Sequence, residues 1–188
     1  FPTDINADKA TYDIQFGTVE RPTHKNTSWD AAKFEVCAHK FADLSEYGYG
    51  VSLLNDCKYG YDIHDSVIRL TLIKCGNYPN PDADKCRHEF TYSLFPHSGD
   101  FREAGTVKLA YLLNSPLEAK KIESQNGTLP EEYSLLSIDS ENVICETVKN
   151  AEDGDGVIVR LYECCNSRAN VNLTLGFDSV SYTHLTLP

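Results

Sequence analysis

The segment IRLTL (residues 68–72) decides the fold class of this 188-residue chain. Its apolar residues Ile68, Leu70 and Leu72 alternate with Arg69 and Thr71. Successive side chains of a β-strand point to opposite faces of a sheet, so such a strand buries one face and leaves the other in water. We therefore expect residues 68–72 to be one strand of a sheet that covers an apolar core.

The same two-residue alternation recurs along the chain, at residues 12–16, 34–38, 90–94, 157–161 and 171–175. The apolar run Val51–Leu54 is expected to be a buried strand. One segment, residues 103–114, instead has apolar residues at helical spacing and predicts a short helix. The sequences NYPNPDAD (77–84) and EDGDG (152–156) predict a loop and a tight hairpin turn.

Many short strands and almost no helix favour an all-β fold, an antiparallel sandwich of sheet on sheet. No internal repeat or clear linker is visible. The segment SQNGTLPEE (124–132) is the one candidate for a boundary between a main sandwich and a smaller sheet. A separate smaller sheet from about residue 130 remains an alternative.

The charge and hydropathy of the sequence limit which partners and which cellular location are expected. With 17 basic and 28 acidic residues the net charge is −11, and the acidic residues are scattered. Nucleic acids and anionic membranes bind basic patches, so neither is expected as the main partner. No apolar stretch has the length of a membrane span, and no signal peptide is visible.

Seven cysteines, an odd number without a CxxC pair, favour reduced thiols and a reducing compartment, so we expect a cytoplasmic protein. Three glycosylation sequons point the other way, but such tripeptides are common by chance; they begin at Asn26, Asn126 and Asn172.

The absence of Met and the last nine residues bear on how much of a native protein this sequence represents. The sequence contains no Met, which favours a fragment of a longer protein. The last nine residues, VSYTHLTLP (180–188), resemble the translation of an adapter used in sequencing libraries. We therefore expect the native domain to span residues 1–179, and His184 carries no functional weight.

The segment LLNDCKYGYD (53–62) concentrates polar chemistry. Asp56 could serve as a general acid, Cys57 as a nucleophile and Lys58 as an anion clamp. However, adjacent strand residues point to opposite faces, and no nearby base would generate a thiolate. A strand end at which Asn55 and Asp56 cap a turn is the favoured alternative.

Other clusters carry weaker signals. Histidines with neighbouring aspartates match no metal-ligand spacing, so solvated or hydrogen-bonded histidines are favoured over a metal site; these are His24, His39 and His64 with Asp30, Asp43 and Asp62. His97 belongs to the same class. Five aromatic residues could form a platform for sugar rings, although ordinary core packing is favoured; these are Trp29, Tyr47, Tyr49, Tyr59 and Tyr61.

Several long blocks resemble the C-terminal region of glycoside hydrolase family 38, and within it the cytosolic and vacuolar α-mannosidase branch. They include NTSWD (26–30), ADLSEYGYGVSLLNDCKYGYD (42–62), RLTL (69–72) and EDGDG (152–156). The resemblance runs in the same order through nearly the whole chain, to about Arg168.

The resemblance implies a supersandwich of the galactose-mutarotase-like type and an α-mannosidase activity. It implies a carboxylate nucleophile, a covalent glycosyl-enzyme and retention of configuration, with a zinc ion that grips the sugar hydroxyls. These groups belong to an N-terminal catalytic domain. No residue of this chain matches the nucleophile or a zinc ligand, so no catalytic residue and no metal ligand is assigned here, and the isolated fragment is expected to be inactive.

The residues expected to reach the substrate cleft or the catalytic domain are Asn55, Asp56, Lys58 and Tyr59, with Arg21 and Trp29 as weaker candidates. The implied partners are mannose-containing oligosaccharides, the N-terminal catalytic domain and further copies in a homo-oligomer. Two alternatives remain open. The chain could be a stand-alone carbohydrate-binding sandwich, or a scaffold that touches no sugar.

Overall fold

The computed structural model describes residues 1–123, 126–128 and 130–177. In chain order its elements are β1 (Lys9–Ile14), β2 (Gly17–Pro22), α1 (Ser28–Ala32), β3 (Val36–Cys37), β4 (Phe41–Glu46), β5 (Tyr49–Asn55), β6 (Gly60–His64), β7 (Val67–Thr71), β8 (Tyr92–Ser98), α2 (Thr106–Asn114), β9 (Leu136–Ile138), β10 (Val143–Asn150), β11 (Val157–Glu163) and β12 (Leu173–Leu175). Among the described residues, no helix has the length and apolar character needed to cross a membrane.

The chain divides into two compact units. Unit 1 comprises residues 1–117 and 164–166, and unit 2 comprises residues 118–163 together with those from 167 onward. The segment 180–188, which the sequence analysis sets apart, lies outside the described residues, as does His184.

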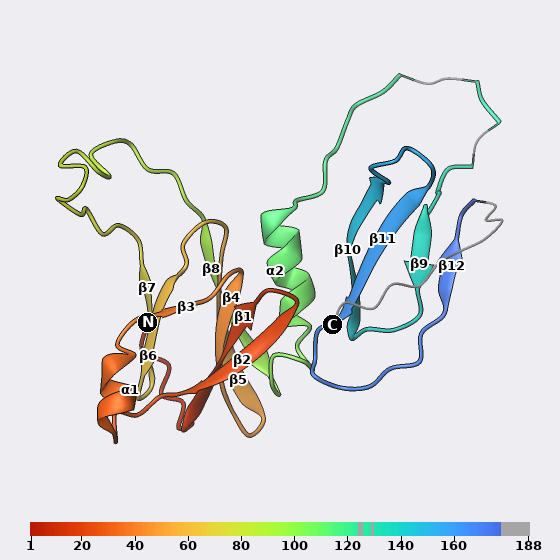
Figure 1. Ribbon diagram of the computed structural model, residues 1–188. Coiled ribbons are helices and arrows are strands. Elements are labelled where there is room, and N and C mark those ends of the chain that lie inside the picture. The colour runs from red at the N-terminus through yellow and green to blue at the C-terminus, as the bar shows by residue number, and fades with distance from the viewer. Residues whose placement is uncertain (124–125, 129, 178–188) are drawn as a thin grey trace. The chain divides into compact units, whose positions relative to one another are not determined.

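Unit 1 is built from two antiparallel sheets (Figure 1), with strand orders β2-β1-β4-β5-β8 and β3-β6-β7. The register pairs Ala42 with Leu53 and Leu44 with Val51, which puts these four side chains on one face of the larger sheet. That face shares one apolar core with the smaller sheet, formed by Ile5, Ala10, Tyr12, Ala38, Ala42, Leu44, Val51, Leu53, Tyr61, Ile63 and Ile68. The expectation of an all-β sandwich is therefore confirmed.

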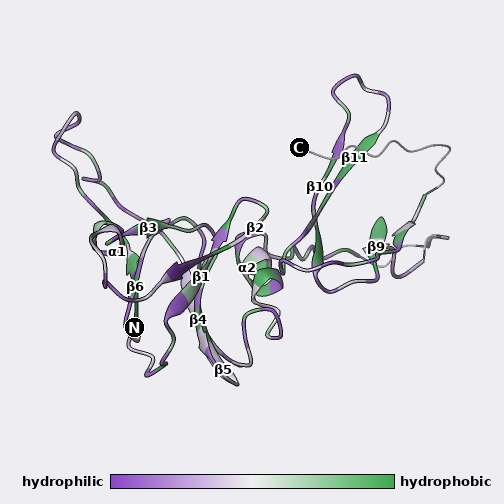
Figure 2. Ribbon diagram, turned by 60° about the horizontal axis from the view of Figure 1, so that its bottom comes forward, coloured by the Kyte–Doolittle hydropathy of each residue, from purple (hydrophilic) through white to green (hydrophobic). Residues whose placement is uncertain are grey.

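Helix α2 covers the opposite face of the larger sheet. It contacts β4 and β5, and its residues Thr106, Val107 and Ala110 are buried. Next to it, the rings of Phe41 and Phe101 pack with their centroids 5.9 Å apart. Strands β4 and β5 are thus buried on both faces. Hydrophobic residues also lie along α2 (Figure 2).

Unit 2 contains two antiparallel pairs, β10 with β11 and β9 with β12. The β10–β11 ladder shifts register between Cys145 and Thr147, which marks a bulge. Its connecting loop closes with a hydrogen bond of 3.0 Å from the amide of Ala151 to the carbonyl of Gly156. The hairpin turn expected at residues 152–156 is therefore confirmed.

The element boundaries differ from the sequence expectations in ways that local geometry explains. The expected helix at 103–114 begins only at Thr106, because Gly105 before it has a left-handed backbone with φ 67°. Helix α1 was not expected, although Thr27 and Asp30 form a capping box at its start. The strand expected at 12–16 ends earlier, because Phe16 has φ 56° and lies in the turn before β2.

Candidate functional site

The segment that joins β5 to β6, residues 55–59 and here called the 55–59 turn, carries four of the six candidate site residues. Asn55 closes the turn from inside and is only 1% exposed. Its Nδ2 donates to the carbonyl of His39 at 2.9 Å and also to the Tyr61 hydroxyl, while its Oδ1 accepts from the amide of Lys58 at 2.5 Å. For Asn55 the turn-capping alternative is confirmed, since this last bond is an Asx-type bond to a backbone amide. For Asp56 it is not, because the Asp56 carboxylate bonds to Thr91 outside the turn.

Asp56 fixes the turn to the chain just before β8. Its Oδ2 accepts from the amide of Thr91 at 2.9 Å, and its own amide donates to the Thr91 carbonyl at 3.1 Å. Partial burial raises the pKa of Asp56, but hydrogen bonds from the Cys57 thiol and from Thr91 outweigh it, and the pKa lies below its usual value. At neutral pH this group is a carboxylate, so it is poorly suited to serve as a general acid.

Cys57 is exposed, yet its environment disfavours the thiolate. The hydrogen bond with Asp56, then partial burial and the Asp56 charge, raise the pKa of the Cys57 thiol. A nucleophilic cysteine needs a lowered pKa. The nucleophile alternative at this position therefore has no electrostatic support.

In the same turn, Lys58 is half-buried and Tyr59 is exposed. The Lys58 ammonium lies 4.8 Å from the centroid of the Phe90 ring, in cation–π geometry. The Tyr59 ring, with 55% of the residue exposed, packs edge-on against His39 at a centroid distance of 5.8 Å. The turn thus presents a carboxylate, an ammonium and a phenol on a backbone held by Asn55.

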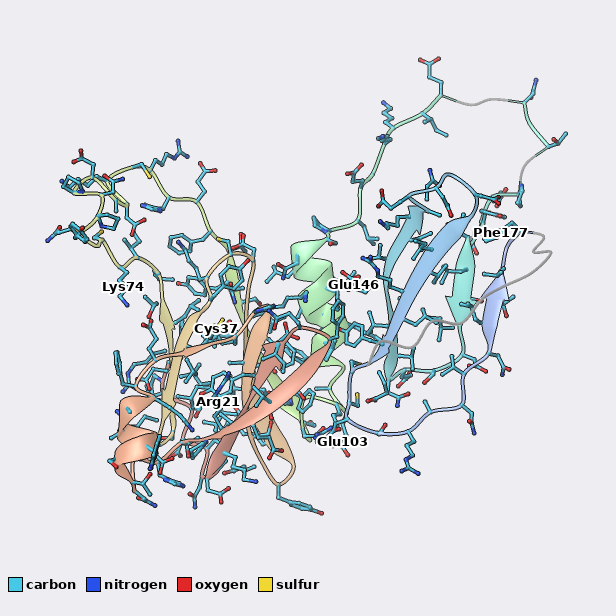
Figure 3. All side chains as sticks on the ribbon, in the orientation of Figure 1. Arg21, Cys37, Lys74, Glu103, Glu146 and Phe177 are labelled. Carbon is cyan, nitrogen blue, oxygen red and sulfur yellow. The ribbon has the colours of Figure 1, made fainter. Side chains whose placement is uncertain are left out.

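Arg21 lies away from this turn, on β2, among the side chains of unit 1 (Figure 3). Its guanidinium packs over the Tyr12 ring at 4.7 Å, and burial raises the pKa of Tyr12 to about 12 although Arg21 lowers it. Arg21, His24, Lys33 and His64 help to line a cavity of about 20 Å³. A cavity of this size holds about one water molecule.

Trp29 is the sixth candidate residue. It is on α1 and is 79% exposed. Within the described ranges, no hydrogen bond, ion pair or ring contact joins Trp29 or Arg21 to the 55–59 turn. The structure therefore brings together four of the six candidates and leaves two elsewhere in unit 1. Whether any of the six reaches a substrate stays a prediction.

The histidine and aspartate residues considered for a metal site do not converge. His24 Nδ1 lies 3.7 Å from Asp30, and His64 Nδ1 lies 3.2 Å from Asp65. Across the described part of the chain, no group of three or more His, Cys, Asp or Glu side chains is arranged to hold a metal ion. The residues present here therefore do not fit the zinc ion that the family resemblance implies.

A buried polar network, here called the Asp43 network, was missed by the sequence analysis. The Asp43 carboxylate accepts from Ser52 at 2.6 Å, contacts His97 Nε2 at 2.8 Å and also accepts from Ser45 at 2.6 Å. Ser52 Oγ lies 2.9 Å from Thr106 Oγ1, at the start of α2. Asp43 sits on β4, Ser52 on β5 and His97 on β8, so the network ties three strands and a helix together.

The network has residue types found in hydrolytic triads but not their geometry. Both Ser52 Oγ and Asp43 Oδ2 approach the same nitrogen of His97, at 3.2 and 2.8 Å. A triad needs the acid and the serine on opposite nitrogens. Ser52 is also fully buried, so no substrate reaches its hydroxyl. The network is therefore structural. No local sequence pattern indicates it, because its residues come from strands that are far apart in the sequence.

The aromatic residues considered for a sugar platform are mostly at the surface. Trp29, Tyr47, Tyr49 and Tyr59 are 79%, 105%, 41% and 55% exposed, and only Tyr61 is buried. The core interpretation was therefore wrong for four of the five. Tyr47 lies in the β4–β5 turn and Trp29 on α1, so these rings come from separate elements.

Comparison with known families and proteins identifies the chain. Residues 1–82 match the model for the glycosyl hydrolases family 38 C-terminal domain, and residues 142–187 match that for the glycosyl hydrolases family 38 C-terminal beta sandwich domain. Among curated proteins, Alpha-mannosidase 2C1 of Homo sapiens is 44% identical over 100% of this chain, and Alpha-mannosidase of Saccharomyces cerevisiae is 42% identical over 96%.

The match covers only part of each relative. The chain spans 17% of the human protein and 18% of the yeast protein. In three dimensions it superposes on an alpha-mannosidase from Enterococcus faecalis with a TM-score of 0.81 and 22% identity, covering 93% of this chain and 21% of that one. This last likeness shows the fold. Taken together, the two family matches and the relatives place the chain in glycosyl hydrolase family 38, as its C-terminal β-sandwich region.

Proposed function

We propose that this chain is the C-terminal part of an α-mannosidase that hydrolyses terminal α-mannosyl residues of oligosaccharides. The observation that carries the proposal is the 44% identity to Alpha-mannosidase 2C1 along the whole chain. The alignment extends over the whole chain, so it includes both units and not only one motif.

The chemistry is proposed to reside outside this chain. A retaining mechanism needs a carboxylate nucleophile, and the proposed zinc ion needs its own ligands. The described residues offer no cluster that could hold a metal ion. We therefore assign the nucleophile and the zinc to an N-terminal catalytic domain, and we assign to this chain the support of that domain and the shaping of its cleft.

The 55–59 turn is the part of this chain that we assign to the cleft. Sugar hydroxyls both donate and accept hydrogen bonds, so they are recognised by carboxylate, ammonium and phenol groups at fixed spacing. The bonds of Asn55 and the tie from Asp56 to Thr91 fix that spacing before a sugar arrives. Such preorganisation reduces the entropy cost of binding.

The experiment compares the isolated chain with the chain joined to its catalytic domain, using an aryl α-mannoside as substrate. We expect no turnover by the isolated chain. The joined protein should turn over, lose activity when zinc is chelated and regain it when zinc is restored. Hydrolysis by the isolated chain, or an inactive joined protein that is folded and loaded with zinc, would contradict the proposal.

A separate experiment on the joined protein tests whether the 55–59 turn contributes to the cleft. The Lys58→Ala variant should lower kcat/KM about 10-fold, as expected for a lost hydrogen bond to a charged group. Lys108→Ala on α2 removes an exposed lysine outside the turn, so it serves as the control variant and should not change kcat/KM. Equal activities of the two variants would leave a scaffold role for this chain.

The stand-alone carbohydrate-binding module is the second candidate, favoured by the exposed Trp29, Tyr47 and Tyr59. Calorimetric titration of the isolated chain with mannose oligosaccharides distinguishes a stand-alone binding module from the C-terminal part of a mannosidase. Saturable binding that is lost in Trp29→Ala supports the module, whereas the mannosidase proposal expects no binding without the catalytic domain.

We further propose a cytoplasmic location and a homo-oligomeric full-length enzyme. All seven cysteines, which lie in the described part of the chain, are thiols and form no disulfide. Thiols of this number are typical of a reducing compartment.

A further inference from the structure

Three buried nitrogen atoms of unit 1 lack a hydrogen-bond partner among the described residues. They are Arg21 Nη1, His24 Nδ1 and His64 Nδ1. Arg21 lies near the end of β2, His24 just after it and His64 at the end of β6. All three residues line the same cavity of about 20 Å³. Because buried polar atoms are normally paired, three such nitrogens around one cavity indicate that it binds a group which pairs with them.

The three nitrogens can all act as donors. Arg21 Nη1 can only donate, and a histidine Nδ1 donates when it carries a hydrogen. A carboxylate beside a ring nitrogen favours that form. Asp30 lies 3.7 Å from His24 Nδ1 and Asp65 lies 3.2 Å from His64 Nδ1, although neither contact is a hydrogen bond. The group that fits the cavity is therefore an acceptor.

The basic side chains around the cavity have no counter-ion. Arg21, Lys25 and Lys33 line it, and within the described ranges no ion pair joins any of the three to a carboxylate. The Arg21 guanidinium is half-buried and packs over the Tyr12 ring at 4.7 Å. A partly buried charge without an opposite charge beside it is costly, so this arginine favours an anion as its partner.

Two carboxylates also line the cavity, but both already have partners. Asp30 accepts from the Thr27 hydroxyl at 2.8 Å and from the Thr27 amide at 3.2 Å, in the capping box of α1. Asp62 pairs with Arg69 at 2.8 Å. With these two groups satisfied, the charge left uncompensated at the cavity is positive.

The size of the cavity limits the anion to one atom. A volume of about 20 Å³ holds one particle the size of a water molecule, so sulfate, phosphate and sugars do not fit. The chain as a whole has a net charge of −11 and repels anions, so binding would depend on this local arrangement. We propose that Arg21, His24 and His64 form a binding site for a monatomic anion, which in a cell is chloride. This inference does not rest on the proposed mannosidase function.

The test measures the NMR line width of chloride in the presence of the folded chain, at constant ionic strength set with sodium gluconate. We expect excess broadening that saturates with chloride and is removed by bromide. Arg21→Gln should weaken chloride binding about 10-fold or more, because a hydrogen bond from a charged group is lost. Arg87→Gln removes an exposed arginine of unit 1 that pairs with Glu89, so it is the control and should bind as the parent does.

Equal broadening in the parent and in Arg21→Gln would overturn the proposal, and so would an equal loss in Arg87→Gln. Sulfate that displaces chloride as well as bromide does would also overturn it, since the site would then be an open basic surface. His24→Leu is a second variant in case Arg21→Gln does not fold. It removes the ring nitrogens at similar volume and should weaken binding by about 3-fold or more.

The chain joined to its catalytic domain separates a free ion from a group of the protein itself. The same difference in broadening between parent and Arg21→Gln is expected there. Loss of this difference in the joined protein would overturn the proposal, because a carboxylate of the catalytic domain would then be the partner of Arg21.

Discussion

Asn55 and Asp56 are neighbours in sequence but have opposite roles at the end of β5. The Asn55 amide points inward and bonds to His39 and Tyr61 inside unit 1. The Asp56 carboxylate is half-buried and accepts from the amide of Thr91 through Oδ2. An amide can be buried when its donors and acceptors are paired, whereas a buried carboxylate would cost far more. Each of the two side chains thus has backbone amides as partners, Asn55 within the turn and Asp56 at Thr91.

His97 makes the stability of unit 1 depend on pH. Burial alone would lower the pKa of His97, but the hydrogen bond and charge of Asp43 outweigh it, and the pKa is raised above its usual value. The folded state therefore binds a proton more tightly than the unfolded state. This stabilisation is fully present below the unfolded pKa of about 6.5 and is lost as the pH rises through the folded pKa.

We therefore expect the urea midpoint of the chain to fall between about pH 6 and about pH 8. The lowered pKa values of Asp56, Asp100 and Asp139 act below this window, where those carboxylates protonate. His97→Gln should abolish the slope. His88→Gln should keep the slope, because the hydrogen-bond partners of the His88 ring are a loop carbonyl and an exposed thiol, neither of which is a carboxylate. A midpoint that rises over this range would contradict the assignment.

The central strands β4 and β5 owe their position to burial on both faces. Apolar side chains line one face, while the Asp43 network lies under α2 on the other. The network needs room, and Gly50 of β5 provides it. A Cβ atom at Gly50 would clash with Ser45 Oγ and with the ring of His97.

Gly50→Ala should therefore destabilise the chain by about 1–3 kcal/mol, because neither neighbour can move without breaking a bond to Asp43. Urea denaturation followed by circular dichroism measures this. Gly17→Ala in β2 is the matched control, since a Cβ atom there meets nothing within 4 Å, and it should change stability by less than about 0.5 kcal/mol. Equal stabilities would show that the network tolerates displacement.

The sequence predicted the architecture because alternation is a local property. Residues 68–72 show it clearly and residues 157–161 less so, because Ile158 interrupts the alternation, and strands lie at both. Pairing between distant strands has no such local signal. Asp43 and His97 are 54 positions apart, so their contact depends on the order of strands in the sheet. For the same reason, the sequence could not tell that Asn55 points inward while Tyr59 is exposed.

At the scale of the whole molecule, each of the two units contains the match to a different family model. The first family model matches residues 1–82, inside unit 1, and the second matches 142–187, most of which belongs to unit 2. The units are joined at residues 117–118 and again around residues 163–167. Described residues at the first junction, such as those at 118–123, are exposed and lie outside helices and strands.

This junction should be the first site of limited proteolysis. Trypsin is expected to cut after Lys120 or Lys121, because exposed backbone outside regular structure opens most readily. Lys9 is also at the surface, but its backbone is paired in β1 and should resist. Mass spectrometry of early digests identifies the cut, and replacing Lys120 and Lys121 by Gln should delay it. A first cut within β1 would contradict the expectation.

The Asp43 network also bears on the order in which unit 1 folds. The β4–β5 hairpin has a turn of only two residues, Tyr47 and Gly48, so it can form early from local contacts. His97 arrives only after the chain between β5 and β8 has closed, and that closure costs entropy before any contact repays it. Until then Asp43 stays hydrated and the hairpin lacks its partner. We infer that docking of β8 and α2 is a late, rate-limiting event, and that the nascent hairpin is the species most exposed to misassembly during synthesis.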